Sequence, residues 1–155
     1  MGAAVDLPAT DWLRAFRVYL GAIAIGNLVW ETLQLPLYTI WTIGTAGEQA
    51  FAVVHCTGGD LLIALTSLVV ALLLVGTREW PRRGFERVAL LAIAIGIAYA
   101  GFSEWLNVSV RRSWAYSDWM PVLPLGSVRI GLSPLAQWII IPAAGFWAVR
   151  KIDKQ

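Results

Sequence analysis

Charged residues are scarce in this chain, and their scarcity excludes the ordinary classes of soluble protein. Only 14% of the 155 residues are Asp, Glu, Lys or Arg, whereas 58% are hydrophobic. A soluble domain carries roughly 25% charged residues. The net charge is +2, and the basic residues lie beside apolar runs. We therefore expect contact with a membrane and no nucleic-acid partner.

Cysteine and histidine are nearly absent, with Cys56 and His55 as the only examples. A lone cysteine excludes an intramolecular disulfide, a CxxC redox pair and a cysteine-rich metal site. Zincin, kinase, P-loop and nucleophile-elbow motifs are also missing from the sequence. No serine lies in a pattern that would make His55 the base of an acyl-transfer triad.

Long apolar runs are what the chain does have. A helix needs about 20 such residues to cross the hydrocarbon core, and Pro36 ends the first run because proline lacks a backbone N–H. The structure that this pattern predicts is an all-α membrane protein, a single domain over residues 1–155 folded as a four-transmembrane-helix bundle. The predicted spans are Val18–Leu35, Phe51–Val75, Val88–Leu106 and Ile130–Val149.

The basic residues predict the orientation of this bundle. Nine of the twelve Lys and Arg lie in the N-terminal flank, the turn 76–87 and the C-terminal tail. Basic residues are retained on the cytoplasmic side, so we expect both termini to be cytoplasmic in a multi-pass protein of the inner (plasma) membrane. The nine residues are Arg14, Arg17, Arg78, Arg82, Arg83, Arg87, Arg150, Lys151 and Lys154.

The polar residues of the spans are predicted to converge at one depth. At about 1.5 Å per residue, Glu31, Asp60 and Glu104 lie roughly 21 to 26 Å from the basic end of their helices. His55 lies at roughly 31 Å on the same scale. The hydrocarbon core is about 30 Å thick, so all four side chains belong to the outer part of the membrane, while the inner half of the helices is apolar.

Helical spacing places further polar groups beside these residues. Asn27, Glu31 and Gln34 follow an i, i+4, i+7 pattern on one helix face, and Ser133 and Gln137 are four residues apart on another helix. Buried carboxyl groups cost several kcal/mol on insertion scales unless they face one another, water or a ligand. The sequence therefore predicts a functional site at this level.

The third loop, residues 109–127, is aromatic, apolar and punctuated by proline. We expect it to fold over the outer end of the bundle as an aromatic lid, with Arg111 and Arg112 above the carboxylates or a substrate's anionic group. The predicted substrate-binding residues are Asn27, Gln34, Tyr38, Arg111, Arg112, Trp114, Tyr116, Asp118, Ser133 and Gln137.

Acid–base chemistry is the function that these groups favour. A carboxyl group in an apolar pocket can donate a proton while an ionised neighbour acts as the base. Isomerisation, hydration or cyclisation of an isoprenoid or other lipid would suit such a site, and the predicted catalytic residues are Glu31, Asp60, Glu104 and His55. No cofactor is expected. The alternative is a divalent metal on these four residues, with Mn, Mg or Fe suited better than zinc.

Two other classes of function stay open. A lipid or cofactor carrier, or a proton-coupled transporter, would move its substrate without converting it. The apolar inner half leaves such a protein no polar path unless it forms a homo-oligomer. An accessory subunit would instead use the polar cluster to dock a partner.

Small residues predict close contacts between helices. Gly21, Gly58 and Gly59 are the principal examples, with further candidates over Ala92–Gly96 and at Gly101.

Four longer strings resemble a group of small bacterial four-helix membrane proteins. That resemblance covers most of the chain and implies the fold but no particular activity. The strings are W-E-x-x-Q-x-P-L-Y (Trp30–Tyr38), H-C-x-x-G-D (His55–Asp60), R-x-W-x-Y-S-x-x-M-P (Arg112–Pro121) and G-L-S-P-x-x-Q-W (Gly131–Trp138).

A shorter string, G-N-x-x-W-E at Gly26–Glu31, resembles the small integral-membrane terpene cyclases of meroterpenoid pathways. In that family the glutamate is an essential acid that acts with a distant aspartate. The resemblance implies that Glu31 is the acid, with Asp60 or Asp118 standing for the partner. This chain is shorter than those cyclases and has fewer helices.

Overall fold

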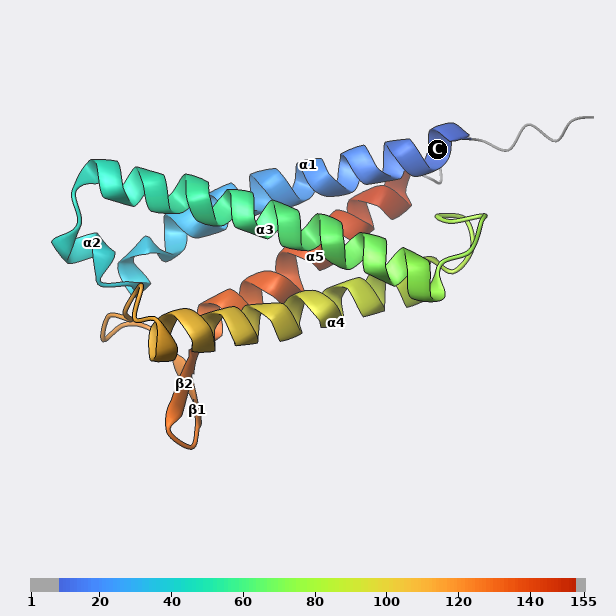
Figure 1. Ribbon diagram of the computed structural model, residues 1–155. Coiled ribbons are helices and arrows are strands. Elements are labelled where there is room, and N and C mark those ends of the chain that lie inside the picture. Colours follow the sequence, from blue (N-terminus) through green and yellow to red (C-terminus); the bar gives the residue numbers. More distant parts are fainter. Residues whose placement is uncertain (1–8, 153–155) are drawn as a thin grey trace, which may run out of the picture.

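Four long helices form the body of the protein (Figure 1). The computed structural model describes residues 9–152, with side chains from Trp12 onward. The long helices are α1 (Ala9–Gln34), α3 (Ala46–Val75), α4 (Phe85–Glu104) and α5 (Leu132–Ile152). The shorter elements are η1 (Leu35–Leu37), α2 (Ile40–Ile43), the π-helical turn η2 (Trp105–Val110) and the strands β1 (Val122–Leu125) and β2 (Val128–Gly131).

The predicted number of membrane spans is confirmed by length and composition. Four helical segments of the described chain are long and apolar enough to cross a membrane: Trp12–Leu37, Ala46–Val75, Phe85–Val110 and Leu132–Ile152. Large apolar side chains such as Leu33, Leu73 and Leu90 point outward and are largely exposed. In water this surface would be costly, whereas lipid solvates it.

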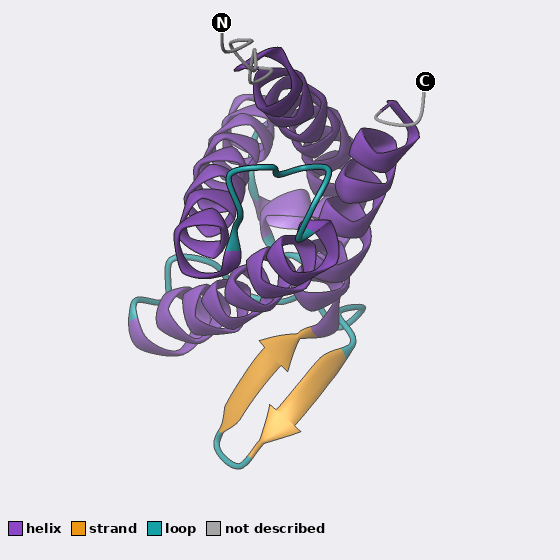
Figure 2. Ribbon diagram, turned by 90° about the vertical axis from the view of Figure 1, so that its right-hand side faces the viewer, coloured by secondary structure: helices purple, strands orange, loops and turns teal. Residues whose placement is uncertain are grey.

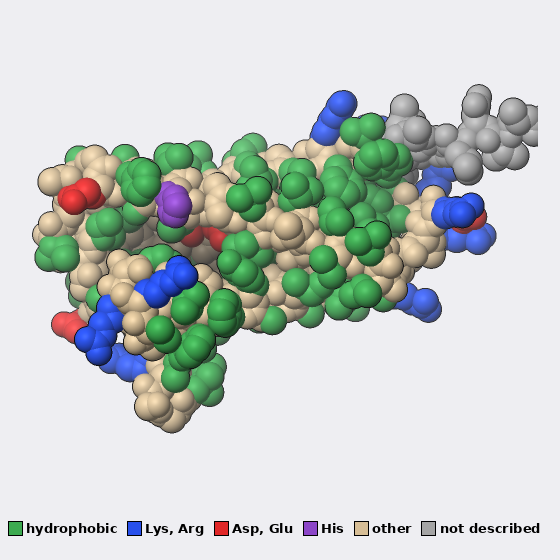
Figure 3. All heavy atoms as spheres, in the orientation of Figure 1, with side chains coloured by type: hydrophobic (Ala, Val, Ile, Leu, Met, Phe, Trp, Pro, Cys, Tyr) green, Lys and Arg blue, Asp and Glu red, His purple; other side chains and the backbone are tan. Residues whose placement is uncertain are grey.

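The helices pack in a ring in which α1 contacts α3 and α5, and α4 contacts the same two helices (Figure 2). The start of α1, the α3–α4 loop and the end of α5 share one end of the bundle, which we name the basic end. Basic side chains gather there (Figure 3). We name the opposite end, which carries α2 and the β1–β2 hairpin, the polar end.

Local chemistry explains where α3 begins and ends. Thr45 and Glu48 form a capping box, in which the Glu48 carboxylate accepts from the Thr45 N–H at 2.8 Å and the Thr45 Oγ accepts from the Glu48 N–H at 3.3 Å. This arrangement satisfies N–H groups that a helix start leaves unbonded. At the other end, Gly76 stops the helix, and Gly84 precedes α4 with a left-handed φ of 73°.

Close helix contacts confirm one predicted glycine, Gly96 of the stretch Ala92–Gly96, and add Gly26, which was not predicted. A Cβ on Gly96 of α4 would lie 2.3 Å from the Trp138 ring of α5, and one on Gly26 of α1 would lie 2.8 Å from Ile141 of α5. Gly21, Gly58 and Gly59 have no such neighbour within 4 Å. The prediction that these three glycines mediate packing is therefore wrong, because they point away from the other helices.

The structure also differs from the all-α prediction in its third loop. Val122–Leu125 pairs antiparallel with Val128–Gly131, and Gly126 supplies a positive φ of 63° in the turn. The hairpin projects sideways from the polar end (Figures 1 and 2). As a result α5 begins at Leu132, and Ile130, which was predicted as the start of the fourth span, belongs to β2.

Candidate functional site

One buried cluster joins three helices near the polar end. We name it the amide–carboxyl cluster and define it by six residues. The spacing of α1 brings its three members onto one helix face, as an i, i+4, i+7 pattern requires. The members are Asn27, Glu31 and Gln34 of α1, Asp60 of α3, and Ser133 and Gln137 of α5.

Gln137 is the centre of this cluster. Its Nε2 lies 3.0 Å from Asn27 Oδ1, 2.9 Å from Glu31 Oε1 and 3.0 Å from Asp60 Oδ2. The side chain is only 2% exposed. A single amide from α5 therefore binds oxygen atoms of both α1 and α3, and it links three spans at one point.

Gln34 continues the network toward the polar end. Its Nε2 donates to Glu31 Oε1 at 2.9 Å and to Gln137 Oε1 at 3.2 Å. Its own oxygen accepts from the Ser133 hydroxyl at 2.8 Å, and that hydroxyl accepts from the Trp30 indole N–H at 3.2 Å. The network is a continuous chain from Trp30 to Asp60.

The Gln137 amide cannot give each of its neighbouring acceptors a hydrogen of its own. The Gln137 amide has two hydrogens and three oxygen acceptors around it. The Glu31 and Asp60 carboxyl groups are also close enough to share a hydrogen bond. Two carboxyl groups can share a hydrogen bond only when one of them carries a proton. Two carboxyl groups placed in this way are suited to hold one acidic proton between them.

Glu104 and Tyr116 form a second polar group beside the cluster. The Tyr116 hydroxyl donates to Glu104 Oε2 and accepts from the Gly131 N–H at 2.8 Å. Trp114 lies beside the same carboxylate, and Glu31 is near enough for its charge to act on Glu104. This second group joins the end of α4 to the third loop and to β2.

Tyr38 and Tyr116 enclose this group from outside the spans. Their ring centroids are 5.7 Å apart. Burial raises the pKa of Tyr116, and its bond to the Glu104 carboxylate raises it further. Burial is also the main cause of the raised pKa of Tyr38, with the charge of Glu104 adding to it. Both phenols therefore act as hydrogen-bond donors rather than as ionised bases.

The loop that carries Tyr116 is anchored to the end of α1. The Thr39 N–H donates to Ala115 O at 2.9 Å, and the Ser117 N–H donates to Leu37 O at 2.9 Å. The Ser117 hydroxyl also donates to Pro36 O at 2.8 Å. These bonds hold Tyr116 at the polar end, close to the carboxyl groups.

Four of the residues predicted for the site are exposed and take part in none of the hydrogen bonds described above. His55 is exposed and stacks on Phe51 with ring centroids 5.4 Å apart, and Figure 3 shows the histidine on the surface. Asp118, Arg111 and Arg112 are also exposed. Neither arginine forms an ion pair with a carboxylate of the described chain.

The metal site considered from the sequence is not assembled. Among the side chains of residues 12–152, no group of three or more His, Cys, Asp or Glu is placed to hold a metal ion. The physical reason is the position of His55, which lies on the outer face of α3, whereas Asp60 turns inward.

Sequence reasoning missed Trp30 as part of the network. The predicted site residues include its neighbour Glu31 but not the Trp30 indole. A signal was present, because a tryptophan N–H within a span usually finds an acceptor when it is buried.

No protein family model, curated protein or solved structure matches this chain. The functional argument therefore starts from the geometry of the two polar groups.

Proposed function

We propose that this protein is a membrane-embedded enzyme that moves protons on a lipid substrate, with an isoprenoid as the substrate class. The observation that carries the proposal is the meeting of two carboxyl groups, those of Glu31 and Asp60, at one buried amide nitrogen, Gln137 Nε2. An acid and a base held together in such surroundings suit general acid–base catalysis.

The hydrogen bonds suggest how the two roles are divided. Glu31 Oε1 accepts from the amides of both Gln34 and Gln137, whereas Asp60 accepts from the Gln137 amide and has the Trp138 indole as its second donor. Donors stabilise the ionised form of a carboxylate. In this proposal Glu31, with two amide donors on one oxygen atom, is the base and Asp60 is the acid, which reverses the role that the terpene-cyclase resemblance implies for Glu31.

The reaction that follows is redox-neutral. The Asp60 carboxyl group transfers its proton to one carbon of a double bond, and the adjacent carbon becomes cationic. That cation loses a different proton to the Glu31 carboxylate, which isomerises the double bond. Alternatively, a second double bond attacks the cation and closes a ring, and the new cation that this leaves loses a proton to Glu31. The proton then returns from Glu31 to Asp60 through their hydrogen bond.

The surroundings of the cluster support this chemistry. Acidic side chains are visible in a recess of the bundle face beside the histidine (Figure 3), so a lipid has a route to them. In the proposal, both termini are cytoplasmic. Tyr38, together with Trp114 and Tyr116 of the anchored loop, closes the site toward the outer face. Its aromatic rings would exclude water from a carbocation.

Solvent deuterium tests the proposal. Proteoliposomes made with the lipid extract of the producing cell would be incubated in D₂O, and carbon-bound deuterium in the lipids would be measured by mass spectrometry. The expected result is labelled isoprenoid with the wild type, and a loss of labelling of roughly 100-fold or more with Asp60→Asn or Glu31→Gln.

Glu86→Gln is the matched control, because Glu86 is an exposed carboxylate at the basic end, paired with Arg150. It should label lipids as the wild type does. A wild-type protein that binds or moves lipids without carbon-bound deuterium would overturn the enzyme proposal in favour of a carrier. A stoichiometric protein partner without labelling would favour the accessory subunit.

A further inference from the structure

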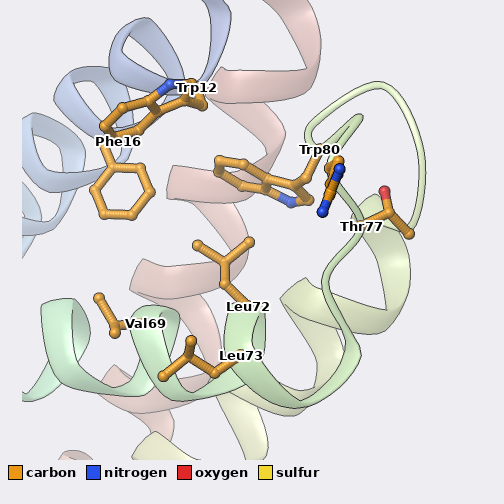
Figure 4. A pocket seen from close by; sticks show the side chains of 8 residues that line it. Trp12, Phe16, Val69, Leu72, Leu73, Thr77 and Trp80 are labelled. Carbon is orange, nitrogen blue, oxygen red and sulfur yellow. The ribbon is translucent and has the colours of Figure 1, made fainter. Parts of the chain in front are cut away.

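A groove opens between α1 and α3 at the basic end, far from the amide–carboxyl cluster along the helices (Figure 4). Its volume is about 340 Å³, compared with roughly 30 Å³ for one water molecule in the liquid. We name it the basic-end groove. Its lining comes from α1, α3 and the loop between α3 and α4, and consists of Trp12, Phe16, Val69, Leu72, Leu73, Thr77, Arg78 and Trp80.

The body of this groove is apolar and aromatic. Trp12 and Phe16 meet edge to face with centroids 5.8 Å apart, and Phe16 meets Trp80 in the same way at 5.9 Å. The opposite wall is aliphatic and includes Leu73, which is 81% exposed. Such walls favour a hydrocarbon chain as the ligand, because the chain buries apolar surface and has no polar group that would need a hydrogen-bond partner.

The loop end of the groove is polar, and one of its donors lacks an acceptor. Trp80 is only 7% exposed, and its Nε1 is buried without a hydrogen-bond partner among the described residues. Buried indole N–H groups usually have an acceptor. In Figure 4 the nitrogen lies on the side of the ring that faces away from Phe16, toward Thr77.

The charge around this donor is positive and partly unpaired. Arg83 pairs with Glu79 at 2.8 Å, and Arg150 pairs with Glu86 at 3.1 Å. Arg78, by contrast, lines the groove and forms no ion pair with any residue of the described chain. The indole N–H lacks a hydrogen-bond acceptor, and the guanidinium group at the same end of the groove lacks a negative charge. An anionic acceptor would satisfy both groups.

We propose that the basic-end groove binds an anionic phospholipid of the adjacent leaflet. One acyl chain lies along Phe16, Val69 and Leu73, and a phosphate oxygen accepts from the Trp80 N–H while pairing with Arg78. Anionic headgroups are attracted to basic residues at this level of a membrane. The site is independent of the proposed acid–base chemistry, and its occupant anchors α1 to α3.

Native mass spectrometry of the delipidated full-length protein tests this site. Dioleoyl-phosphatidylglycerol and dioleoyl-phosphatidylcholine would be added in equal amounts, so that the acyl chains are the same and only the headgroup differs. The wild type should retain the phosphatidylglycerol preferentially. Arg78→Gln and Trp80→Phe should each reduce that preference, by roughly fivefold for the arginine.

Arg87→Gln is the charge control, because Arg87 is an exposed arginine at the same end that does not line the groove. It should retain the wild-type preference. Equal retention of the two lipids by the wild type would mean that the groove does not recognise an anionic headgroup. An equal loss with Arg87→Gln would mean that the charge of the whole end, and not a defined site, attracts the lipid. Either result would overturn the proposal.

A groove-filling variant tests the acyl-chain position without changing charge. Leu73→Trp should reduce phosphatidylglycerol binding, whereas Leu74→Trp should not, because Leu74 is exposed on the same helix but lies outside the groove lining. Both positions are on the surface, so neither variant disturbs the core. Undiminished binding in Leu73→Trp would overturn the proposal.

Discussion

At the scale of single residues, the two polar groups differ in what they connect. The amide–carboxyl cluster joins helix to helix, with Gln137 as the shared donor. Tyr116 instead joins a loop to the bundle, since its hydroxyl binds the Glu104 carboxylate and the Gly131 N–H. One oxygen atom therefore holds the third loop, the end of α4 and β2 together.

Tyr116→Phe should destabilise the protein by about 1–3 kcal/mol, because it leaves the buried Glu104 carboxylate without its tyrosine donor. Thermal unfolding in detergent would measure the loss. Tyr99→Phe is the matched control, since Tyr99 is half exposed and its hydroxyl forms no hydrogen bond to the described chain. An equal change in both variants would contradict the role given to Tyr116.

The unfolding temperatures of Tyr116→Phe and of the wild type should also depend differently on pH above pH 10. The ordinary pKa of tyrosine is 10.0, and that of folded Tyr116 is raised above it. Above pH 10 the Tyr116 hydroxyl is still protonated in the folded state, whereas it begins to ionise in the unfolded state. The stabilisation that the Tyr116 hydrogen bond gives to the folded state is therefore complete below pH 10 and falls as the pH rises further. The unfolding temperature of Tyr116→Phe should fall less steeply above pH 10 than that of the wild type.

At the scale of secondary-structure elements, the sequence predicted the spans well because membrane hydrocarbon imposes a length and a composition on them. It predicted their ends less well. The first helix begins at Ala9 rather than near Val18, because the apolar pattern detects the part of a helix that lies in lipid and not where the helix starts. The β1–β2 hairpin was missed because each strand has only four residues and β1 contains a proline, which argues against a strand.

The glycine contacts show a second limit of the sequence. Gly58 and Gly96 both lie within helices, but only Gly96 faces another helix closely, with a Cβ position 2.3 Å from Trp138. Glycine identity alone cannot distinguish the two, since the difference depends on how each helix is rotated in the bundle. The same rotation separates His55, which faces outward, from Asp60, which faces Gln137.

Gly96→Ala and Gly58→Ala should therefore have opposite effects. Both changes improve helix propensity by up to about 1 kcal/mol, but Gly96→Ala also forces α4 and α5 apart and should cost about 1–3 kcal/mol through overpacking. Thermal unfolding of the two variants in the same detergent would measure the difference. A Gly96→Ala protein as stable as Gly58→Ala would show that α4 and α5 are not held at this distance.

At the scale of the whole molecule, the two ends of the bundle have different tasks in these proposals. The polar end carries the carboxyl groups, the tyrosines and the hairpin, and the basic end carries arginines and the proposed phospholipid groove. The sequence predicted this division because the order of apolar runs and charged residues along the chain determines on which side of the membrane each loop lies. It could not predict which side chains meet, since Trp30, Ser133 and Gln34 become one chain of hydrogen bonds only through helix packing.

The division predicts a single orientation in the membrane. In a Cys56→Ser background, a cysteine placed at exposed Ser127 in the hairpin turn should react with a membrane-impermeant maleimide in spheroplasts of the producing cell. A cysteine at Arg87, exposed at the basic end, should react only after the membrane is permeabilised, because basic flanks are retained in the cytoplasm. The reverse labelling would place the carboxyl groups toward the cytoplasm, and the substrate would then have to reach them from the inner leaflet.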